Sequence, residues 1–269
     1  MSAIALTIAG SDSGGGAGIQ ADLKAMSALG VYGASVITAV TAQNTKAVTA
    51  IQSIDLPVIA AQIDAVLSDL DVKAVKIGML ANSEIIETVV GALAGFEGPI
   101  VVDPVMIAKS GDALLADKAV STLREELLPR ATVLTPNLPE AAKLLKSTAA
   151  KSTKEMAAQG EALCEFGPQA VLMKGGHAEG EVCRDILVSN DGSQAEFTAK
   201  RLNTPNTHGT GCTLSAAVAA GLTKGLDLTH AVGDAHAYLQ GAIAAADSLE
   251  IGQGHGPVHH FHQLWKGRT

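Results

Sequence analysis

Residues 3–18 read AIALTIAGSDSGGGAG, in which an apolar run leads directly into a glycine-rich loop. The run from Ala3 to Ala9 is nearly continuous rather than alternating, as expected of a strand that is covered on both faces. The density of glycine in residues 10–18 lets the backbone approach a ligand closely. Because ligands of open α/β sheets bind outside the carboxyl ends of the strands, this stretch predicts a buried parallel sheet with a ligand-binding edge.

The same order of apolar run and helical stretch repeats along the chain. Further runs of strand length lie at residues 35–40, 72–77, 100–102, 132–134 and 170–173. Stretches with apolar residues every three or four positions, typical of helices, lie between them at residues 19–29, 58–70, 84–93 and 118–127. Strand followed by helix, repeated, predicts an α/β fold with a mainly parallel central sheet.

After the last of these strands the pattern changes. Short pieces around residues 185–188 and 196–199 predict two hairpin strands, joined by an Asn-Asp-Gly turn at residues 190–192. The last third of the chain is predicted to be helical, at residues 211–222 and 229–249.

Composition excludes several classes of protein. The chain has 269 residues, of which 47% are hydrophobic and 17% charged, so it can bury a large core and is not intrinsically disordered. Its longest apolar runs fall far short of the roughly 20 residues that cross a bilayer, and its start lacks the pattern of a secretory signal. No linker or internal repeat is visible. We therefore expect a soluble cytoplasmic protein with no membrane partner, folded as a single domain over residues 1–269.

Charge and cysteine content narrow the partners further. The formal net charge is −8 and no stretch is rich in lysine and arginine, which argues against nucleic acid and favours a small molecule. Cys164, Cys183 and Cys212 are odd in number and widely spaced, which suits neither a disulfide framework nor a four-ligand zinc site. We expect Cys164 to fill space in a helix, and we assign Cys183 to a loop.

The first glycine loop matches neither of two familiar nucleotide-binding motifs. The dinucleotide fingerprint needs a third glycine where Ile19 stands. The P-loop needs lysine followed by serine or threonine where Gly16 and Ala17 stand. The loop is thus either a ligand-binding loop of another kind or a structural tight turn.

A second glycine loop, NTHGTGCT at residues 206–213, leads straight into the apolar stretch 214–222. The N-terminus of a helix offers unpaired N–H groups and a partial positive charge, so this loop predicts an anion site suited to phosphate. The same setting lowers the pKa of a thiol, which makes Cys212 a candidate for a reactive thiolate. The alternative is that Cys212 is simply a small buried residue.

Carboxylates follow two of the predicted strands. Asp103 comes directly after residues 100–102, and Asn137 and Glu140 follow residues 132–134 at the start of a predicted helix. Beside a phosphate site, carboxylates of this kind are candidate ligands for Mg²⁺. Asn137 and Glu140 also fit a helix cap and its first-turn acid, and we favour that interpretation when they are taken alone.

A lysine and a pair of amides occupy two more strand ends. Lys174 follows residues 170–173, where it can offset nucleotide phosphate charge or simply be solvated. Gln43 and Asn44 offer paired amides, which read the edge of a heterocycle through a donor and an acceptor together. The histidines near residue 260 resemble metal ligands, but no cysteine or acid lies near them and a proline interrupts their spacing, so we predict no metal there. They are His255, His259, His260 and His262.

These residues, in this order, resemble the ribokinase-like superfamily and, within it, the bacterial hydroxymethylpyrimidine/phosphomethylpyrimidine kinase family of thiamine biosynthesis. The resemblance runs nearly from end to end, and its many blocks in register make it highly specific. The blocks are TIAGSD at 7–12, GGAGIQADLK at 15–24, AQNT at 42–45, KIGML at 76–80, DPVM at 103–106 with AKSG at 108–111, TPNLPEA at 135–141, LMKGGH at 172–177, NTHGTGCT at 206–213 and GPVHHFH at 256–262.

The resemblance implies a three-layer α/β/α sandwich with a small β lid, and a homodimeric kinase that uses ATP and magnesium. It implies two reactions, which phosphorylate 4-amino-5-hydroxymethyl-2-methylpyrimidine to its monophosphate and then to its diphosphate. A flap from Met106 to Ala113 is expected to close over the substrate and exclude water.

The resemblance also assigns roles to residues by matching motif. Those expected around the pyrimidine are Gly10, Asp22, Gln43, Met79 and Val105. Those expected to serve Mg-ATP are Asp103, Asn137, Glu140 and Lys174, with Asp103 and Glu140 as the metal ligands. Those expected at the reacting phosphate are Gly209, Thr210 and Gly211, which form the anion hole, and Cys212.

Most of the superfamily carries an aspartate base where this sequence, like its branch, has Cys212. A carboxylate suits an alcohol nucleophile, but it would repel the phosphate that attacks in the second reaction. We hypothesise that a thiol, partly ionised by the helix end, assists the first reaction and stays neutral in the second.

Three alternatives compete with this interpretation. A pyridoxal kinase of the same branch often carries another cysteine in the flap, where this sequence has Ala108, Lys109 and Ser110. A non-catalytic sensor on the same fold would be expected to lose the anion loop or the acids, and both are intact. An NAD(P)-dependent oxidoreductase lacks its fingerprint here. The pyridoxal kinase is the nearest rival.

Overall fold

The computed structural model describes residues 2–106, 114–116, 118–177 and 180–265. Within these ranges, nine strands form one sheet in the order β3-β2-β1-β4-β5-β6-β7-β8-β9. The strands are β1 (Ile4–Asp12), β2 (Tyr32–Gln43), β3 (Val48–Ser53), β4 (Ala74–Ile77), β5 (Ile100–Val102), β6 (Val133–Leu134), β7 (Ala170–Lys174), β8 (Val182–Ser189) and β9 (Gln194–Lys200). Strands β1, β2 and β4 to β7 pair in parallel, whereas β3, β8 and β9 pair antiparallel to their neighbours. The predicted α/β fold with a mainly parallel sheet is confirmed.

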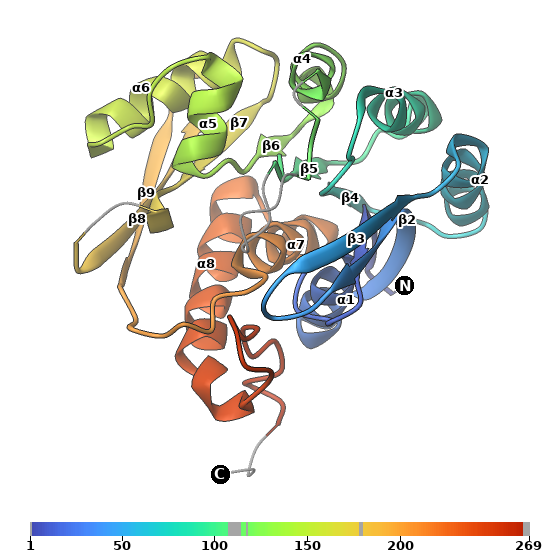
Figure 1. The fold of residues 1–269 in the computed structure, drawn as a ribbon. Helices are drawn as coiled ribbons and strands as arrows, with labels where there is room; N and C mark the ends of the chain where they lie inside the picture. The colour runs from blue at the N-terminus through green and yellow to red at the C-terminus, as the bar shows by residue number, and fades with distance from the viewer. Residues whose placement is uncertain (1, 107–113, 117, 178–179, 266–269) are drawn as a thin grey trace.

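Helices cover both faces of this sheet (Figure 1). Helices α1, α7 and α8 pack together on one face, and α2 to α6 lie along the other. The α-helices are α1 (Gly18–Ala28), α2 (Leu56–Leu67), α3 (Ser83–Ala92), α4 (Ala119–Thr122), α5 (Leu138–Leu145), α6 (Thr153–Cys164), α7 (Thr210–Thr223) and α8 (Leu228–Ala244). Shorter π or 3-10 turns are η1 (Leu123–Leu127), η2 (Leu128–Arg130), η3 (Gly175–His177) and η4 (Ala246–Leu249). The three-layer arrangement expected from the resemblance is therefore present.

The two faces of the sheet carry different cores. Successive side chains of a strand point to opposite faces, so Leu6 and Ile8 of β1 enter one core while Ala5 enters the other. The core under α2 to α6 is rich in leucine, isoleucine and valine. The core under α7 contains the run 216–220, which is alanine except for Val218. Small side chains let α7 lie close to the sheet, and this brings its N-terminus to the strand ends.

The structure departs from the sequence predictions in several elements. Strand β3 was not predicted, because most of its side chains are exposed and its residues form no continuous apolar run. The helix predicted at 118–127 is α-helical only to Thr122, continues as a π turn and ends before Pro129, which has no N–H to donate. The helix predicted at 229–249 ends at Ala244 and is followed by a 3-10 turn.

The predicted hairpin is present, but it is longer than expected. At its turn, Gly192 has φ of +83°, and its N–H donates to Ser189 O at 3.0 Å. Strand β8 begins at Val182 and pairs Cys183 with Ala199 of β9, so the assignment of Cys183 to a loop was wrong. Among the described residues, no helix has the length and apolar character needed to cross a membrane.

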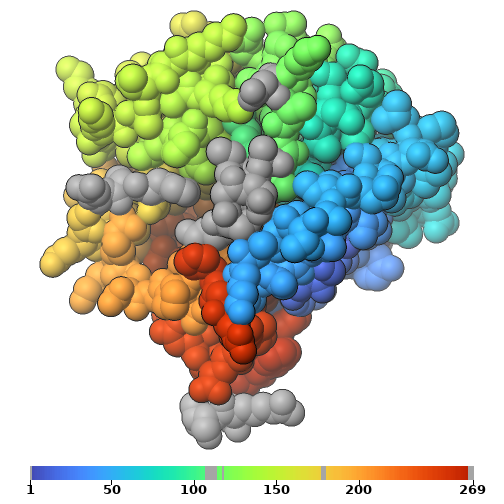
Figure 2. Space-filling model, in the orientation of Figure 1, coloured from blue at the N-terminus to red at the C-terminus, as the bar shows by residue number. Residues whose placement is uncertain are grey.

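The β2-to-β3 ribbon occupies one edge of the sheet and contacts a segment near residue 255. The N–H of His255 donates to Thr45 O at 2.8 Å, and the N–H of Gly254 donates to Thr45 Oγ1 at 3.1 Å. Figure 2 shows the red segment lying against the blue ribbon. This antiparallel ribbon, with β3 largely exposed, is a small β element at the edge of the sheet, and the resemblance implies a small β lid without placing it.

Candidate active site

A cavity of about 730 Å³ lies at the carboxyl ends of the parallel strands. Parallel strands end at the same edge of a sheet, and the N-terminus of α7 reaches that edge from the helical layer. The strand ends supply Asp12, Gln43, Asp103 and Lys174 to its wall. This is the location that the sequence predicted for ligand binding.

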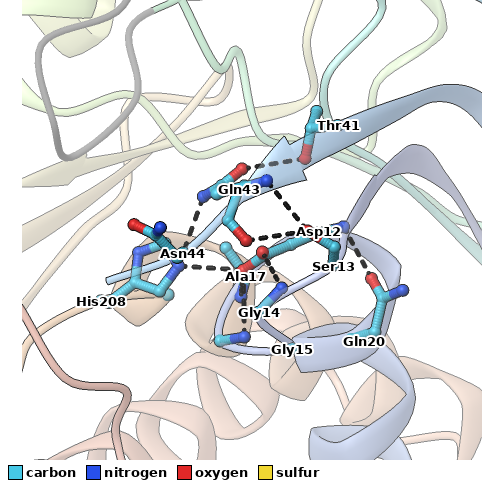
Figure 3. Close-up of polar contacts among 12 residues, drawn as sticks. Asp12, Ser13, Gly14, Gly15, Ala17, Gln20, Thr41, Gln43, Asn44 and His208 are labelled. Carbon is cyan, nitrogen blue, oxygen red and sulfur yellow. Dashed lines mark hydrogen bonds and ion pairs between the residues drawn. The ribbon is translucent and has the colours of Figure 1, made fainter. Parts of the chain in front are cut away.

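Asp12 organises the first glycine loop (Figure 3). Its Oδ1 accepts the N–H of Gly14 at 2.8 Å, and its Oδ2 accepts the N–H groups of Gly16 at 3.0 Å and Ala17 at 2.8 Å. Although burial acts to raise it, hydrogen bonds from His208, Ala17 and Gly14 hold the pKa of Asp12 below its ordinary value. The loop is therefore a tight turn and also part of the cavity wall, so the two sequence interpretations are compatible.

The two glycine loops are in direct contact. Gly209 has φ of +81°, and a Cβ built on it would lie 1.9 Å from Gly16 O. A Cβ on Gly16 would lie 2.3 Å from Cδ2 of His208. Glycine is thus required at both positions by the close approach, and at Gly209 also by the backbone conformation.

The second loop ends at the N-terminus of α7. The N-cap of this helix is Gly209, which has no side chain to cap it, so N–H groups of its first turn are available to a ligand. Thr210, Gly211 and Cys212 all line the cavity. A Cβ on Gly211 would stand 3.4 Å from Asp103 Oδ2 and 3.5 Å from Lys174 Nζ, so this helix end faces that ion pair.

Asp103 and Lys174 form an ion pair across the cavity wall. Lys174 Nζ lies 2.8 Å from Asp103 Oδ1, and the side chains are only 13% and 2% exposed. Weaker contacts to Asp103 come from Thr135 Oγ1 at 3.3 Å and Ser215 Oγ at 3.4 Å. The alternative that Lys174 is a solvated surface lysine is wrong, because it is largely buried and paired.

Asn137 and Glu140 form the helix cap that the sequence favoured. Asn137 Oδ1 accepts the N–H of Glu140 at 2.9 Å, and Glu140 Oε2 accepts the N–H of Asn137 at 2.8 Å. Both residues also line the cavity. Burial raises the pKa of Glu140 to about 7, with Lys174 acting against this and Asp103 adding to it. Glu140 is thus a cap residue whose buried carboxylate also faces the cavity, close enough for the charge of Asp103 to act on it.

A second ion pair joins Lys76, in the cavity wall, to Asp22 behind it. Lys76 Nζ is 2.8 Å from Asp22 Oδ2, and both side chains are 0% exposed. Thr7 Oγ1 donates to the same oxygen at 2.6 Å. Burial raises the pKa of Asp22 although Lys76 acts to lower it, and Asp22 in turn raises the pKa of Lys76 against burial. Lys76 lines the cavity whereas Asp22 does not, so the residue expected beside the substrate stands one layer further back.

Charges from both ion pairs act on Cys212, and its environment overturns the expectation of a thiolate. Burial raises the pKa of its thiol to about 11, and the negative charges of Asp22 and Asp103 add to this effect. The positive charge of Lys76 acts in the opposite direction but does not reverse it. Cys212 is therefore a neutral thiol at neutral pH.

The other two cysteines lie in different surroundings. Cys164 packs at the margin of the aliphatic core, with Sγ 3.7 Å from Val188 O, as expected of a space-filling residue. Cys183 lines the cavity from β8, where burial raises its pKa.

The remaining residues expected at the substrate also reach the cavity. They are Gly10, Gln43, Met79 and Val105. A Cβ on Gly10 would lie 3.0 Å from Met79 Sδ, so these two are in contact. The predicted flap lies outside the described residues except for Met106, whose carbonyl accepts the N–H of Leu114 at 2.9 Å.

Sequence reasoning gave no role to three residues that the structure brings to the cavity: Asp12, His208 and Lys76. Lys76 had a detectable signal, because a lysine interrupts the apolar run 72–77. Asp12 and His208 lie in the two glycine loops, and nothing in their sequence surroundings indicated a role for them. Among the described residues, no group of three or more histidine, cysteine or acidic side chains could hold a metal ion. His260 instead contacts Thr213 Oγ1 through Nε2 at 3.0 Å.

Comparisons with known proteins identify the family of this chain. A family model described as phosphomethylpyrimidine kinase matches residues 12–259. A hydroxymethylpyrimidine/phosphomethylpyrimidine kinase of Rhizobium meliloti is 60% identical over 266 residues, which cover 99% of this chain and 100% of the relative. The crystal structure of a Clostridium difficile phosphomethylpyrimidine kinase is similar with a TM-score of 0.79 and 45% identity, over 89% of this chain and 99% of that one. An ADP complex of Bacillus subtilis pyridoxal kinase is similar with a TM-score of 0.89 and 35% identity, over 98% and 99% of the two chains.

Proposed function

This chain belongs to the phosphomethylpyrimidine kinase family, and from that premise we propose that it phosphorylates 4-amino-5-hydroxymethyl-2-methylpyrimidine twice with ATP, to the monophosphate and then to the diphosphate. The activity is that of a kinase of thiamine biosynthesis. The observation that carries the proposal is the uncapped N-terminus of α7, which faces the Asp103/Lys174 pair inside one cavity. A transferring phosphoryl group needs this combination of N–H groups and a cation.

Residues of several elements line the cavity. We assign the part of its wall formed by Gly10, Gln43, Met79 and Val105 to the pyrimidine. We assign the part of its wall formed by α8, which includes Leu239, to the nucleotide. The first turn of α7 also lines the cavity, and we place the transferring phosphoryl group there.

Phosphoryl transfer depends mainly on positioning and on neutralising charge. We assign Lys174 to charge neutralisation, because its ammonium faces the cavity next to α7. We assign Gly209, Thr210 and Gly211 to the anion hole, in which backbone N–H groups hold the transferring phosphate.

The residues near Lys174 fit a magnesium site. Magnesium prefers oxygen ligands and is usually held by one or two carboxylates together with substrate phosphates. Asp103 and Glu140 supply two such carboxylates, and a cation bound there would offset the burial that raises the pKa of Glu140 to about 7. When bound with ATP, the ion would supply charge neutralisation, and Asn137 would hold Glu140 in place through the cap.

The neutral Cys212 refines the idea that a thiol replaces an aspartate. With a thiol pKa of about 11, Cys212 carries no negative charge at neutral pH in either reaction. It therefore does not repel the phosphate that attacks in the second reaction, and it contacts the hydroxyl in the first as an uncharged group. Cys212→Asp should harm diphosphate formation much more than monophosphate formation, and equal losses would contradict this role.

The test of the proposed function is product analysis resolved by phosphate number. Purified protein is given ATP and the hydroxymethylpyrimidine, and products are separated by anion-exchange chromatography over time. Monophosphate should appear first and diphosphate should follow. A parallel reaction with pyridoxal addresses the second candidate, which the similarity to the Bacillus subtilis enzyme favours. Turnover of pyridoxal alone would reject the pyrimidine assignment.

We also propose a homodimeric, cytoplasmic protein with one domain over residues 1–269. The support is the family resemblance and the single sheet that contains all strands of the described part of the chain. Light scattering coupled to size-exclusion chromatography would measure the oligomeric state directly.

A further inference from the structure

Three side chains meet at one nitrogen atom on the substrate side of the cavity (Figure 3). His208 Nε2 lies 2.9 Å from Asp12 Oδ2 and 3.3 Å from Gln43 Nε2. His208 and Asp12 are 7% and 2% exposed, so water does not take the place of these contacts. All three side chains line the cavity.

The proton on this nitrogen can be assigned from its partners. An ionised carboxylate only accepts hydrogen bonds, and the hydrogen bonds that lower the pKa of Asp12 keep it ionised. Nε2 of His208 must therefore carry a proton and donate it to Asp12. A protonated ring nitrogen has no free lone pair, so it cannot also accept an N–H from the amide of Gln43.

A second conflict appears at the other end of the same amide. Thr41 Oγ1 lies 2.9 Å from Ser11 O and 3.2 Å from Gln43 Oε1, both of which are acceptors. The hydroxyl has one proton, and the shorter contact to Ser11 uses it. With its nitrogen toward His208 and its oxygen toward Thr41, the amide of Gln43 would thus be mismatched at both ends.

Turning the amide end over removes both conflicts. The oxygen of Gln43 then accepts from Nε2–H of His208, which shares its proton between this oxygen and Asp12. The nitrogen then donates to Thr41 Oγ1, which still donates to Ser11. Every polar group in the chain from Asp12 to Ser11 then has a partner of the correct kind.

We propose that His208, held by Asp12, is a positioning residue for substrate recognition, because it fixes the amide of Gln43 with the oxygen toward His208 and the nitrogen toward Thr41. This inference rests on the proposed function of the cavity. An aminopyrimidine presents an exocyclic N–H donor beside a ring-nitrogen acceptor. Gln43 matches that pair only when its own donor and acceptor are held in one order. Pyridoxal has no amino group beside a ring nitrogen and gains nothing from this order.

Hydrogen bonds to the backbone of Gln43 and His208 hold both residues in place. Ser13 Oγ accepts the N–H of Gln43 at 2.9 Å and donates to its carbonyl at 2.7 Å. The N–H of His208 donates to Gly256 O at 3.0 Å, and its carbonyl accepts the N–H of Val258 at 3.3 Å. His208 also directly precedes Gly209, the N-cap of α7, so the group that orders Gln43 is one residue from the phosphate loop.

The proton assignment is tested on the free protein, without substrate. In ¹⁵N-histidine-labelled protein, two-bond ¹H–¹⁵N correlation spectra identify which ring nitrogen is protonated, and the signals lost in His208→Gln assign His208. A protonated Nε2 at neutral pH is expected. A bare Nε2 would overturn the proposal, whatever the enzyme's substrate proves to be.

The positioning role is tested with a matched pair of variants. Glutamine places its N–H near the position of Nε2, whereas asparagine is too short to reach it. His208→Asn should therefore raise KM for the pyrimidine about tenfold, leave kcat and KM for ATP within about threefold, and lower the preference for pyrimidine over pyridoxal. His208→Gln should restore most of the affinity and preference. His260→Gln, which removes another buried histidine, should leave the preference unchanged.

Each outcome bears on the proposal. Equal effects of asparagine and glutamine would show that His208 only fills space, and would overturn the positioning role. Failure of the unsubstituted protein to phosphorylate the pyrimidine would reject the proposed function and the recognition role together, while the proton assignment on Nε2 would still decide the orientation of the amide.

Discussion

The Asp22/Lys76 pair and the Asp103/Lys174 pair have the same nitrogen-to-oxygen distance of 2.8 Å, and charges from both pairs act on the pKa of Cys212. The first pair has 0% exposure on both side chains and receives a further short hydrogen bond from Thr7. The second pair opens on the cavity, with 13% exposure on Lys174, and its additional contacts are longer than 3.2 Å.

Because their surroundings differ, one lysine–aspartate pair is structural and the other is available for binding. A sealed pair cannot exchange partners, because either charge left alone in the interior would pay a large desolvation cost. The Asp22/Lys76 pair is therefore a fixed structural element of the site. The ammonium of Lys174 can turn from Asp103 toward an incoming phosphate, so the second pair can take part in binding. The two pairs therefore differ in burial and not in nitrogen-to-oxygen distance, and only the less buried pair is available for binding.

The largest expected effect is on the sealed pair. Asp22→Ala leaves the ammonium of Lys76 buried without its carboxylate, and the free energy of unfolding should fall by about 3–5 kcal/mol. Urea denaturation followed by circular dichroism measures this. The double variant Asp22→Ala/Lys76→Met should recover part of the loss, because it removes the unpaired charge. If Asp22→Ala has the same free energy of unfolding as the parent protein, this pair does not stabilise the fold.

The next effect is on activity at the open pair. Lys174→Met removes the cation that faces the phosphates, and kcat/KM should fall about 10²–10³-fold in both reactions. The unfolding free energy should fall less than in Asp22→Ala, because the cavity admits water and ions to Asp103. Steady-state kinetics and urea denaturation of the same samples give both numbers. Lys154→Ala, on the surface of α6, is the control for the loss of a lysine.

Cys212 should report on both pairs through its reactivity. With its pKa raised by burial to about 11, the thiolate fraction at pH 8 should be about a hundredfold lower than for a thiol of pKa 9. Alkylation by iodoacetamide, followed by mass spectrometry of the Cys212 peptide, should thus be slow at pH 8 and accelerate toward pH 11. Lys76→Met should move the profile to still higher pH, because the positive charge of Lys76 favours the thiolate. Rapid alkylation at pH 8 would support the thiolate that the sequence suggested.

The smallest effect is expected for a third pair of the same kind at the surface. Lys73 Nζ lies 2.6 Å from Asp71 Oδ1, but the side chains are 47% and 58% exposed. Lys73→Ala should change the unfolding free energy by less than about 0.5 kcal/mol, because water already solvates both charges. If Lys73→Ala lowers the free energy of unfolding as much as Asp22→Ala does, burial does not determine how much an ion pair contributes.

The central sheet was predictable because most of its strands are short and buried on both faces. Ile100–Val102 of β5 and Ala170–Lys174 of β7 were located within one residue at each end. β3 escaped because an exposed edge strand need not be apolar, and its register depends on β2 rather than on its own sequence. The π turn after Thr122 has only five residues, too few to change the spacing of apolar residues from which a helix is predicted.

The site was predictable only as a set of loops. The rule that ligands bind at the carboxyl ends of parallel strands brought Gln43, Asp103 and Lys174 to one edge. The rule could not tell which charges would pair, because Asp22 and Lys76 are 54 positions apart and meet only across α1 and β4. It also missed the loss of the Cys212 thiolate, since the helix N-terminus is a local feature whereas burial and the acids nearby come from the whole fold.

The bridge between His208 and Pro257 has a consequence for the timing of folding. His208 meets Asp12 across 196 positions of the sequence, and its backbone is held by residues 256–258, which a ribosome makes after every strand of the sheet. Contacts between such distant positions cost much loop-closure entropy and tend to form late. A growing chain can therefore pair its first strands long before its two glycine loops touch. During synthesis the framework precedes the catalytic centre, and a chain that has not yet extended past residue 258 lacks the backbone contacts that hold His208.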